Sequence, residues 1–247
     1  MRAMWHFSQL TPQQHEQALA LVREAIKLDP NLAQAHMALA RTLISRVSYG
    51  WSDDTGRDIS ESYRAAARSV LMDDRDPYSH YAFCWASLMS LMHAQALEEA
   101  QRSIDLNPNF ALGFFALGAV RIYIGHFREA LDALLRSLRL NPNDPQAGTL
   151  LHFVGLAHYH QENYEEAVHY CQQAVRARRL YIGLRTLLAS LGQLGRVEEA
   201  KPLLDEFISL HSKDAQQQFE ATTPYLDLKY REHVANGLRR AGVPDFR

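Results

Sequence analysis

The sequence predicts an all-α fold built by stacking a repeated pair of helices. Three observations support this prediction. A segment of 34 residues recurs, apolar residues within each copy recur at intervals of three and four, and the 247 residues include only 12 Gly and 9 Pro. Apolar spacing of three and four places side chains on one face of a helix. Few glycines and prolines leave room for long uninterrupted helices rather than many short strands.

The repeat is clearest in the middle of the chain. Leu106–Asn109 reads LNPN and recurs 34 residues later at Leu140–Asn143, and a related copy, LDPN, stands at Leu28–Asn31. Ala96 and Ala130 keep the same separation of 34 residues. The residue before a proline is pushed out of the α region, so each Asn-Pro or Asp-Pro ends a helix. The unit is therefore a helix, a turn and a second helix that stops at the proline.

Small residues mark the first helix of each unit. We expect them to let the second helix approach closely, and they stand at Gly118, Gly155, Cys84 and Ala40. The period, the helix–turn–helix unit, these small residues and the terminal proline together resemble the tetratricopeptide (TPR) repeat family. The resemblance covers roughly Gln14 to Ser212 and implies a right-handed α-solenoid, a superhelix of antiparallel helix pairs, with a C-terminal capping helix.

This resemblance divides the chain into a TPR array at 1–212 and C-terminal capping helices with a tail at 213–247. The array begins with a partial first repeat whose second helix is Pro12–Leu28. The second repeat departs most, with about ten extra residues that predict an enlarged inter-helix loop at about 47–57. The five full repeats are expected at Leu32–Asp74, Asp76–Pro108, Asn109–Pro142, Asn143–Arg179 and Leu180–Ser212.

The capping region is expected to hold two helices. Lys213–Ala221 reads as a polar-faced helix, residues 222–225 as a break, and Asp227–Arg240 as a final helix. Gly242 and Pro244 follow it, and Gly then Pro just past a helix is a stop signal. An array needs its terminal apolar face covered, which is the role we expect for this region.

Three further segments resemble a narrower group: the opening Trp5–Phe7, the loop Gly50–Asp54 and the ending Gly237–Pro244. They look like the C-terminal repeat region of bacterial class III adenylate cyclases and related winged-helix transcriptional regulators. In that group the region follows a catalytic or DNA-binding domain, which this sequence does not contain. The resemblance implies a regulatory or protein-interaction role, either as a fragment or as a stand-alone product.

The TPR resemblance also implies a concave groove lined by the first helix of each repeat. Tyr, Trp and Arg concentrate binding energy at interfaces, so an extended or helical partner segment with apolar anchors and one acidic group is expected. Some TPR domains grip a carboxylate with a Lys/Asn/Arg clamp, but those positions here hold Met37, Arg41 and Ala82, which does not predict that ligand class. The groove residues carried over from the family are Met37, Arg41, Tyr78, Tyr81, Trp85, Phe115, Ile122, Tyr123, His152, Tyr159, His160 and Arg185.

Two alternatives to this groove stay open. Each aromatic residue on its own is about as well explained by packing in the core, where large apolar side chains are favoured. A homodimer through the same face, or through the convex side, is the other.

No motif predicts an enzyme, a cofactor or a metal site. His158 and His160 are two residues apart, so they point away from each other on a helix, and no Cys or acidic residue completes a zinc spacing. Asp53–Asp58 lacks the alternating carboxylates and distal Glu of an EF-hand. Gly237–Gly242 has no Lys-Ser/Thr of a phosphate loop, and no Gly-x-Ser-x-Gly elbow occurs.

Composition narrows the class of protein further. Hydrophobic residues make up 47% of the chain, enough for a core, and the net charge of −2 argues against a nucleic-acid partner. The two cysteines, Cys84 and Cys171, fit a reducing compartment, and the longest apolar stretches fall short of the ~20 residues of a membrane span. We therefore predict a cytoplasmic bacterial scaffold that binds a protein or peptide, with no nucleic acid and no membrane. The alternative is a dimerisation or sensory module of an adenylate cyclase or transcriptional regulator.

Overall fold

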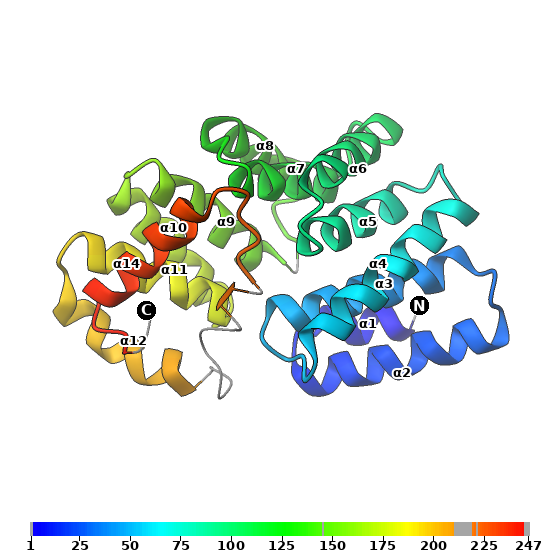
Figure 1. Ribbon diagram of the computed structural model, residues 1–247, viewed down its shortest axis with the longest axis horizontal. Coiled ribbons are helices and arrows are strands. Elements are labelled where there is room, and N and C mark those ends of the chain that lie inside the picture. The colour runs from blue at the N-terminus through cyan, green and yellow to red at the C-terminus, as the bar shows by residue number, and fades with distance from the viewer. Residues whose placement is uncertain (1, 145, 210–218, 221, 245–247) are drawn as a thin grey trace. The chain divides into compact units, whose positions relative to one another are not determined.

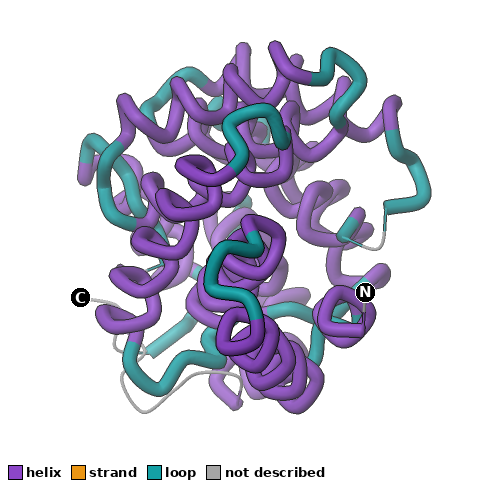
Figure 2. The backbone as a smooth tube through the Cα atoms, turned by 90° about the vertical axis from the view of Figure 1, so that its right-hand side faces the viewer, coloured by secondary structure: helices purple, strands orange, loops and turns teal. Residues whose placement is uncertain are grey.

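The computed structural model describes residues 2–144, 146–209, 219–220 and 222–244, and every regular element in these ranges is a helix (Figure 2). The all-α prediction is confirmed. Contacts within the chain separate two compact units, Met1–Leu117 (unit 1) and Gly118–Arg247 (unit 2). The predicted domain boundary at 212/213 stays a prediction, because residues 210–218 are outside the described ranges.

Figure 1 labels the helices in chain order. They are α1 (Arg2–Ser8), α2 (Pro12–Leu28), α3 (Ala33–Ser48), α4 (Thr55–Met72), α5 (Pro77–Met89), α6 (His93–Leu106), α7 (Ala111–Tyr123), α8 (Phe127–Leu140), α9 (Ala147–His160), α10 (Tyr164–Ala177), α11 (Tyr181–Gln193), α12 (Val197–Ser209) and α14 (Leu228–Arg240). Helix α2 has the bounds that the sequence predicts. Among the described residues, no helix combines the length and the apolar character needed to cross a bilayer.

In unit 1 successive helices pack side by side, α3 against α4 and α5 against α6, and each pair then packs on the next. Leu19 of α2, Leu43 of α3, Ala66 of α4 and Ala86 of α5 are buried in one apolar cluster. Burial of such side chains is the main force that holds neighbouring pairs together. Helix α1, which the sequence analysis does not predict, packs on α2 and α3 through the buried Phe7.

The extra residues of the second repeat lengthen its helices more than its loop. Helix α3 continues to Ser48 and α4 begins at Thr55, so the link is residues 49–54 rather than about 47–57. The carboxylate of Asp54 accepts a hydrogen bond from the backbone N–H of Arg57 at 3.0 Å. Such a cap satisfies a backbone donor that the first turn leaves without a helical partner, which explains why α4 starts so early.

In unit 2, α9 packs on α10, α10 on α11, and α11 on α12. The small residues have the role predicted for them: a Cβ on Gly118 would lie 2.5 Å from Leu134 Cγ, and one on Gly155 would lie 2.5 Å from Cys171 Sγ. Ala130 is fully buried, as are the corresponding alanines of the other second helices, Ala96, Ala167 and Ala200. The repeat read from the sequence is therefore a repeat of packing positions.

The C-terminal capping helix is α14, which packs on α11 in unit 2. Asp227 caps it by accepting a hydrogen bond from the backbone N–H of Lys229 at 3.0 Å. Gly192 of α11 and Gly237 of α14 form a close seam, since a Cβ on Gly192 would collide with the carbonyl oxygen of Gly237. The other predicted capping helix, at Lys213–Ala221, lies largely outside the described residues.

Candidate partner-binding faces

The predicted groove residues of unit 1 come together from α3, α5 and α7. The guanidinium carbon of Arg41 lies 5.2 Å from the ring centroid of Tyr81 and 6.0 Å from that of Tyr78. The ring of Trp85 lies 6.5 Å from Tyr81 and 5.4 Å from the ring of Phe115. The sixth residue, Met37, is buried in the apolar cluster of this unit, and Tyr81 and Phe115 are buried as well.

Phe7 of α1 completes the surroundings of Arg41, with its ring centroid 4.9 Å from the guanidinium carbon. We call Phe7, Arg41, Tyr78 and Tyr81 the Arg41 site. Sequence reasoning missed Phe7 as a site residue because α1 was not predicted, although Trp5–Phe7 was singled out as a motif. Arg41 is half-buried and Tyr78 is 42% exposed, so the site is open to solvent on the Tyr78 side.

The electrostatics of the Arg41 site are those of a cation held among rings. Aromatic faces attract a guanidinium, most strongly where water is partly excluded. The contacts of Arg41 within the described part of the chain are with rings, and no carboxylate there forms an ion pair with it. Its N–H groups are therefore available to an acceptor from outside.

The predicted groove residues of unit 2 are closed off from solvent. They are between 0% and 8% exposed, and they are Ile122, Tyr123, His152, Tyr159, His160 and Arg185. The open face that the sequence analysis expects is not what the structure shows here. The physical reason is that the chain itself returns to this face after α12 and covers it.

The covering contacts are specific. The backbone N–H of Leu226 donates to the carbonyl oxygen of Tyr123 at 2.9 Å, and the hydroxyl of Tyr159 donates to the carbonyl oxygen of His233 at 2.7 Å. The hydroxyl of Tyr225 and Nε2 of His160 are 2.6 Å apart. Sequence reasoning placed the groove side of these pairs but not their partners, because nothing in residues 222–233 signals that they fold back.

Burial sets the protonation of this face. It lowers the pKa of His160 to about 3, and the charge of His233 acts in the same direction. Burial and then the charge of Arg185 lower the pKa of His152. Burial raises the pKa of Tyr123 to about 12, although Arg185 opposes the shift. Both histidines and the tyrosine are therefore neutral near pH 7, and Arg185 carries the charge.

Side chains that suggested other chemistry have structural partners. The rings of His158 and Tyr170 stack with centroids 5.4 Å apart, and His160 stacks on Phe127 at 4.8 Å. Burial raises the pKa of the Cys84 and Cys171 thiols, which disfavours the reactive thiolate. Within the described ranges, no three His, Cys, Asp or Glu side chains are grouped so that they could hold a metal ion.

The acidic loop of the second repeat also has structural roles. Asp54 caps α4, while Asp58 accepts a hydrogen bond from the hydroxyl of Ser52 at 2.7 Å and lies 3.5 Å from Nε of the buried Arg46. Arg46 pairs with Glu16 as well. The ring of Trp51 packs 4.9 Å from His15. This loop therefore fastens α2, α3 and α4 together.

Residues 115–181 match the protein family described as "Tetratricopeptide repeat". The chain's curated relatives include an Hsp70-Hsp90 organizing protein of Triticum aestivum, 25% identical over 118 residues, and Hsp70-Hsp90 organizing protein 2 of Arabidopsis thaliana, 25% identical over 88 residues. These matches cover 48% and 35% of this chain, which spans only 19% and 15% of the relatives' length.

Solved structures show the same fold. The APC/C hetero-tetramer Cut9–Hcn1 superposes with a TM-score of 0.64 at 17% identity, over 90% of this chain and 42% of that one. TTC0263, a thermophilic TPR protein in Thermus thermophilus, superposes with a TM-score of 0.61 at 18% identity, over 84% of this chain and 99% of that one. Neither the matched family nor these proteins are described as cyclases or winged-helix regulators, so the narrower resemblance and the regulatory alternative gain no support and stay predictions.

Proposed function

We propose that this protein is a non-catalytic scaffold whose repeats bind a protein or peptide partner, and that the Arg41 site makes the decisive contact. The match to a repeat family that serves protein interaction supports the first part. The second part rests on one observation, the half-buried guanidinium of Arg41 among three aromatic rings with no carboxylate of the described chain paired to it.

The chemistry of the Arg41 site defines the partner. A guanidinium presents a planar fork of donors that matches a carboxylate, and such pairs are among the stronger hydrogen bonds in proteins. The ring of Tyr78 is exposed beside it and offers an apolar platform of the kind that anchors an aromatic or aliphatic side chain. The expected ligand is a peptide segment with one acidic group next to an apolar side chain.

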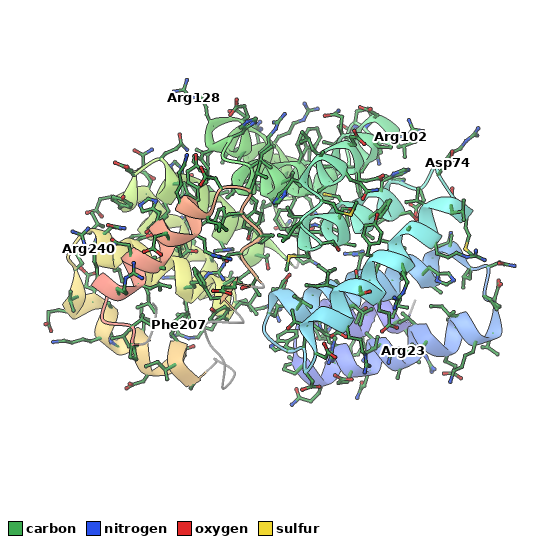
Figure 3. All side chains as sticks on the ribbon, in the orientation of Figure 1. Arg23, Asp74, Arg102, Arg128, Phe207 and Arg240 are labelled. Atoms are coloured by element: carbon green, nitrogen blue, oxygen red, sulfur yellow. The ribbon has the colours of Figure 1, made fainter. Side chains whose placement is uncertain are left out.

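The test is to select peptides from a phage-displayed library of random sequences on the full chain, and to measure the affinity of the synthesised peptides by fluorescence anisotropy. We expect acidic residues beside aromatic or aliphatic ones to be enriched. Arg41→Ala should weaken their binding by ~2 kcal/mol, or about 30-fold. Arg102→Ala is the matched control, because Arg102 is an exposed arginine of the same unit (Figure 3).

Two results would contradict the proposal. One is a library that yields no peptide dependent on acidic residues. The other is a set of peptides that bind Arg41→Ala as tightly as the parent chain.

A further inference from the structure

A second face, in unit 2, is closed by the chain itself. Residues 219–220 and 222–233, which we call the closing segment, lie against Tyr123, Tyr159, His160 and Arg185. Each of these four residues is one that the sequence predicts to contact a partner. The occupant of the predicted groove is therefore a stretch of the protein's own chain.

The closing segment is held in the way that a peptide ligand would be. Residues 223–225 belong to no helix, and the backbone N–H of Leu226 donates to the Tyr123 carbonyl at 2.9 Å. Tyr225 is the anchor: it is buried, its ring lies 4.9 Å from Tyr123 and 5.2 Å from His160, and its hydroxyl meets His160 at 2.6 Å. One buried aromatic anchor with main-chain hydrogen bonds is a common mode of peptide recognition.

The closing segment does not supply an anion for the buried guanidinium of Arg185 from its described residues. Arg185 is 1% exposed, and its Nη1 donates to the hydroxyl of Thr222 at 3.0 Å. The rings of Tyr181 and Phe219 are both 5.5 Å away, and within unit 2 as described no carboxylate forms an ion pair with it. Its Nε has no hydrogen-bond partner there. A buried guanidinium is ordinarily neutralised by an anion, and in the described part of this unit it has none.

His152 strengthens this observation. It is as deeply buried as Arg185, and neither of its ring nitrogens has a hydrogen-bond partner among the described residues. After burial itself, the nearby positive charge of Arg185 also lowers the pKa of the His152 ring. A carboxylate at this position would pair with Arg185 and could accept a hydrogen bond from the His152 ring.

We infer that this face is a second peptide-binding site, that its ligand is an acidic peptide whose carboxylate pairs with Arg185, and that the closing segment must leave before the peptide binds. The inference rests on the proposed function in one respect, that the repeats bind peptides. It uses different residues in a different unit, so Arg41→Ala weakens binding at the Arg41 site and leaves this site intact. The two proposals can therefore fail separately.

The first test places a carboxylate beside Arg185 within the intact chain. Thr222→Asp and Thr222→Asn are close in shape and differ in charge. We expect the Asp variant to unfold at a temperature about 5 °C higher than the Asn variant, because only the carboxylate neutralises Arg185. With Arg185→Met in both, the order should reverse, since the new carboxylate is then buried without a partner.

The second test supplies the ligand from outside. The probe is a fluorescein-labelled peptide with the sequence of residues 222–233 and Asp in place of the first Thr. Tyr225→Ala in the full chain removes the anchor and should bind this probe at least tenfold more tightly than the parent chain. Leu226→Ala is the matched control, because Leu226 neighbours Tyr225 but its side chain is exposed. Circular dichroism checks that both variants keep their helices.

Specificity for Arg185 is tested in the Tyr225→Ala background. Arg185→Met should abolish binding of the probe, whereas Arg128→Met, at an exposed arginine of the same unit (Figure 3), should leave it unchanged. The inference is overturned if Thr222→Asp is no more stable than Thr222→Asn. It is also overturned if the Tyr225→Ala variant binds the acidic probe no more tightly than the parent chain does. The same holds if this variant binds the acidic probe no more tightly than it binds the peptide with the native Thr.

Discussion

Two arginines that the sequence places in the predicted groove have different environments. Arg41 is half-buried among rings and open on one side, while Arg185 is buried under residues that follow α12. Helical spacing is enough to put both on the first helices of their repeats, because spacing decides which face a residue occupies. It could not predict their burial, which depends on where a distant segment folds back.

The buried His15 makes the stability of the folded chain depend on pH. Burial lowers the pKa of His15 from 6.5 to about 4; the hydrogen bond to the Thr11 carbonyl opposes this, and the charge of Arg46 adds to it. The unfolded chain therefore takes up a proton from about pH 6.5 downward, while the folded chain does not until about pH 4. The contribution to stability is complete above pH 6.5, and between these values it falls by about 1.4 kcal/mol per pH unit.

The measurement is urea denaturation from pH 7.5 to 4.5, for the parent chain and for His15→Phe. Phenylalanine suits the surroundings of His15, whose ring lies 5.0 Å from Phe7 and 4.9 Å from Trp51. The variant should lose stability less steeply as the pH falls. Parallel curves would show that His15 titrates normally in the folded chain.

Glycine substitution tests the seam between α11 and α14. Gly192→Ala should destabilise the protein by about 3 kcal/mol, because the new methyl group meets the backbone of α14 rather than a side chain that could move. Gly56→Ala is the control, since its Cβ would meet only Asp54 Oδ1, at 3.8 Å, and it lies in the first turn of α4. If chemical denaturation finds the two variants equally stable, the backbones of α11 and α14 do not approach as closely as the structure shows.

At the scale of helices, the sequence predicts the bounds of a helix well where the apolar spacing and the position of a proline indicate the same end. Pro12–Leu28 has its predicted bounds, and the final helix, expected at Asp227–Arg240, is α14. Helix α1 was missed because its seven residues bury only Phe7 and so present no apolar stripe. The sequence predicts too long a loop in the second repeat, because it does not reveal that the backbone N–H of Arg57 donates to Asp54 and so starts α4 there.

Helix α14 also yields a test of its docking. Leu238 is fully buried and Leu228, on the same helix, is exposed. Leu238→Ala should cost about 3 kcal/mol of unfolding free energy, and Leu228→Ala less than about 0.5 kcal/mol. Equal losses in urea denaturation would mean that α14 does not pack on α11 in solution.

At the scale of the molecule, the division into two units has a spectroscopic signature. Trp5, Trp51 and Trp85 are the three tryptophans of the chain, and all lie in Met1–Leu117. Tryptophan fluorescence therefore reports on unit 1, while circular dichroism reports on the helices of both units. The stability of stacked repeats is approximately the sum of a term for each repeat and a term for its contacts with its neighbours, so units with different stabilities need not unfold together.

The prediction follows from combining this signature with the α14 variant. In Leu238→Ala, which weakens unit 2, the circular dichroism transition in urea should begin at a lower concentration than the fluorescence transition. Leu228→Ala should show the same spacing between the two curves as the parent chain. Superimposed transitions in Leu238→Ala would mean that the chain unfolds as a single cooperative body.

The Tyr225 anchor has a chemical consequence. Its phenol is buried against His160, whereas the side chain of Tyr78 is partly exposed to solvent. A nitrating or iodinating reagent will therefore discriminate between the two rings while the groove of unit 2 is shut, and it will lose that discrimination once the groove opens. The protein thus contains its own reporter of whether the segment is in place, readable by mass spectrometry without any added label.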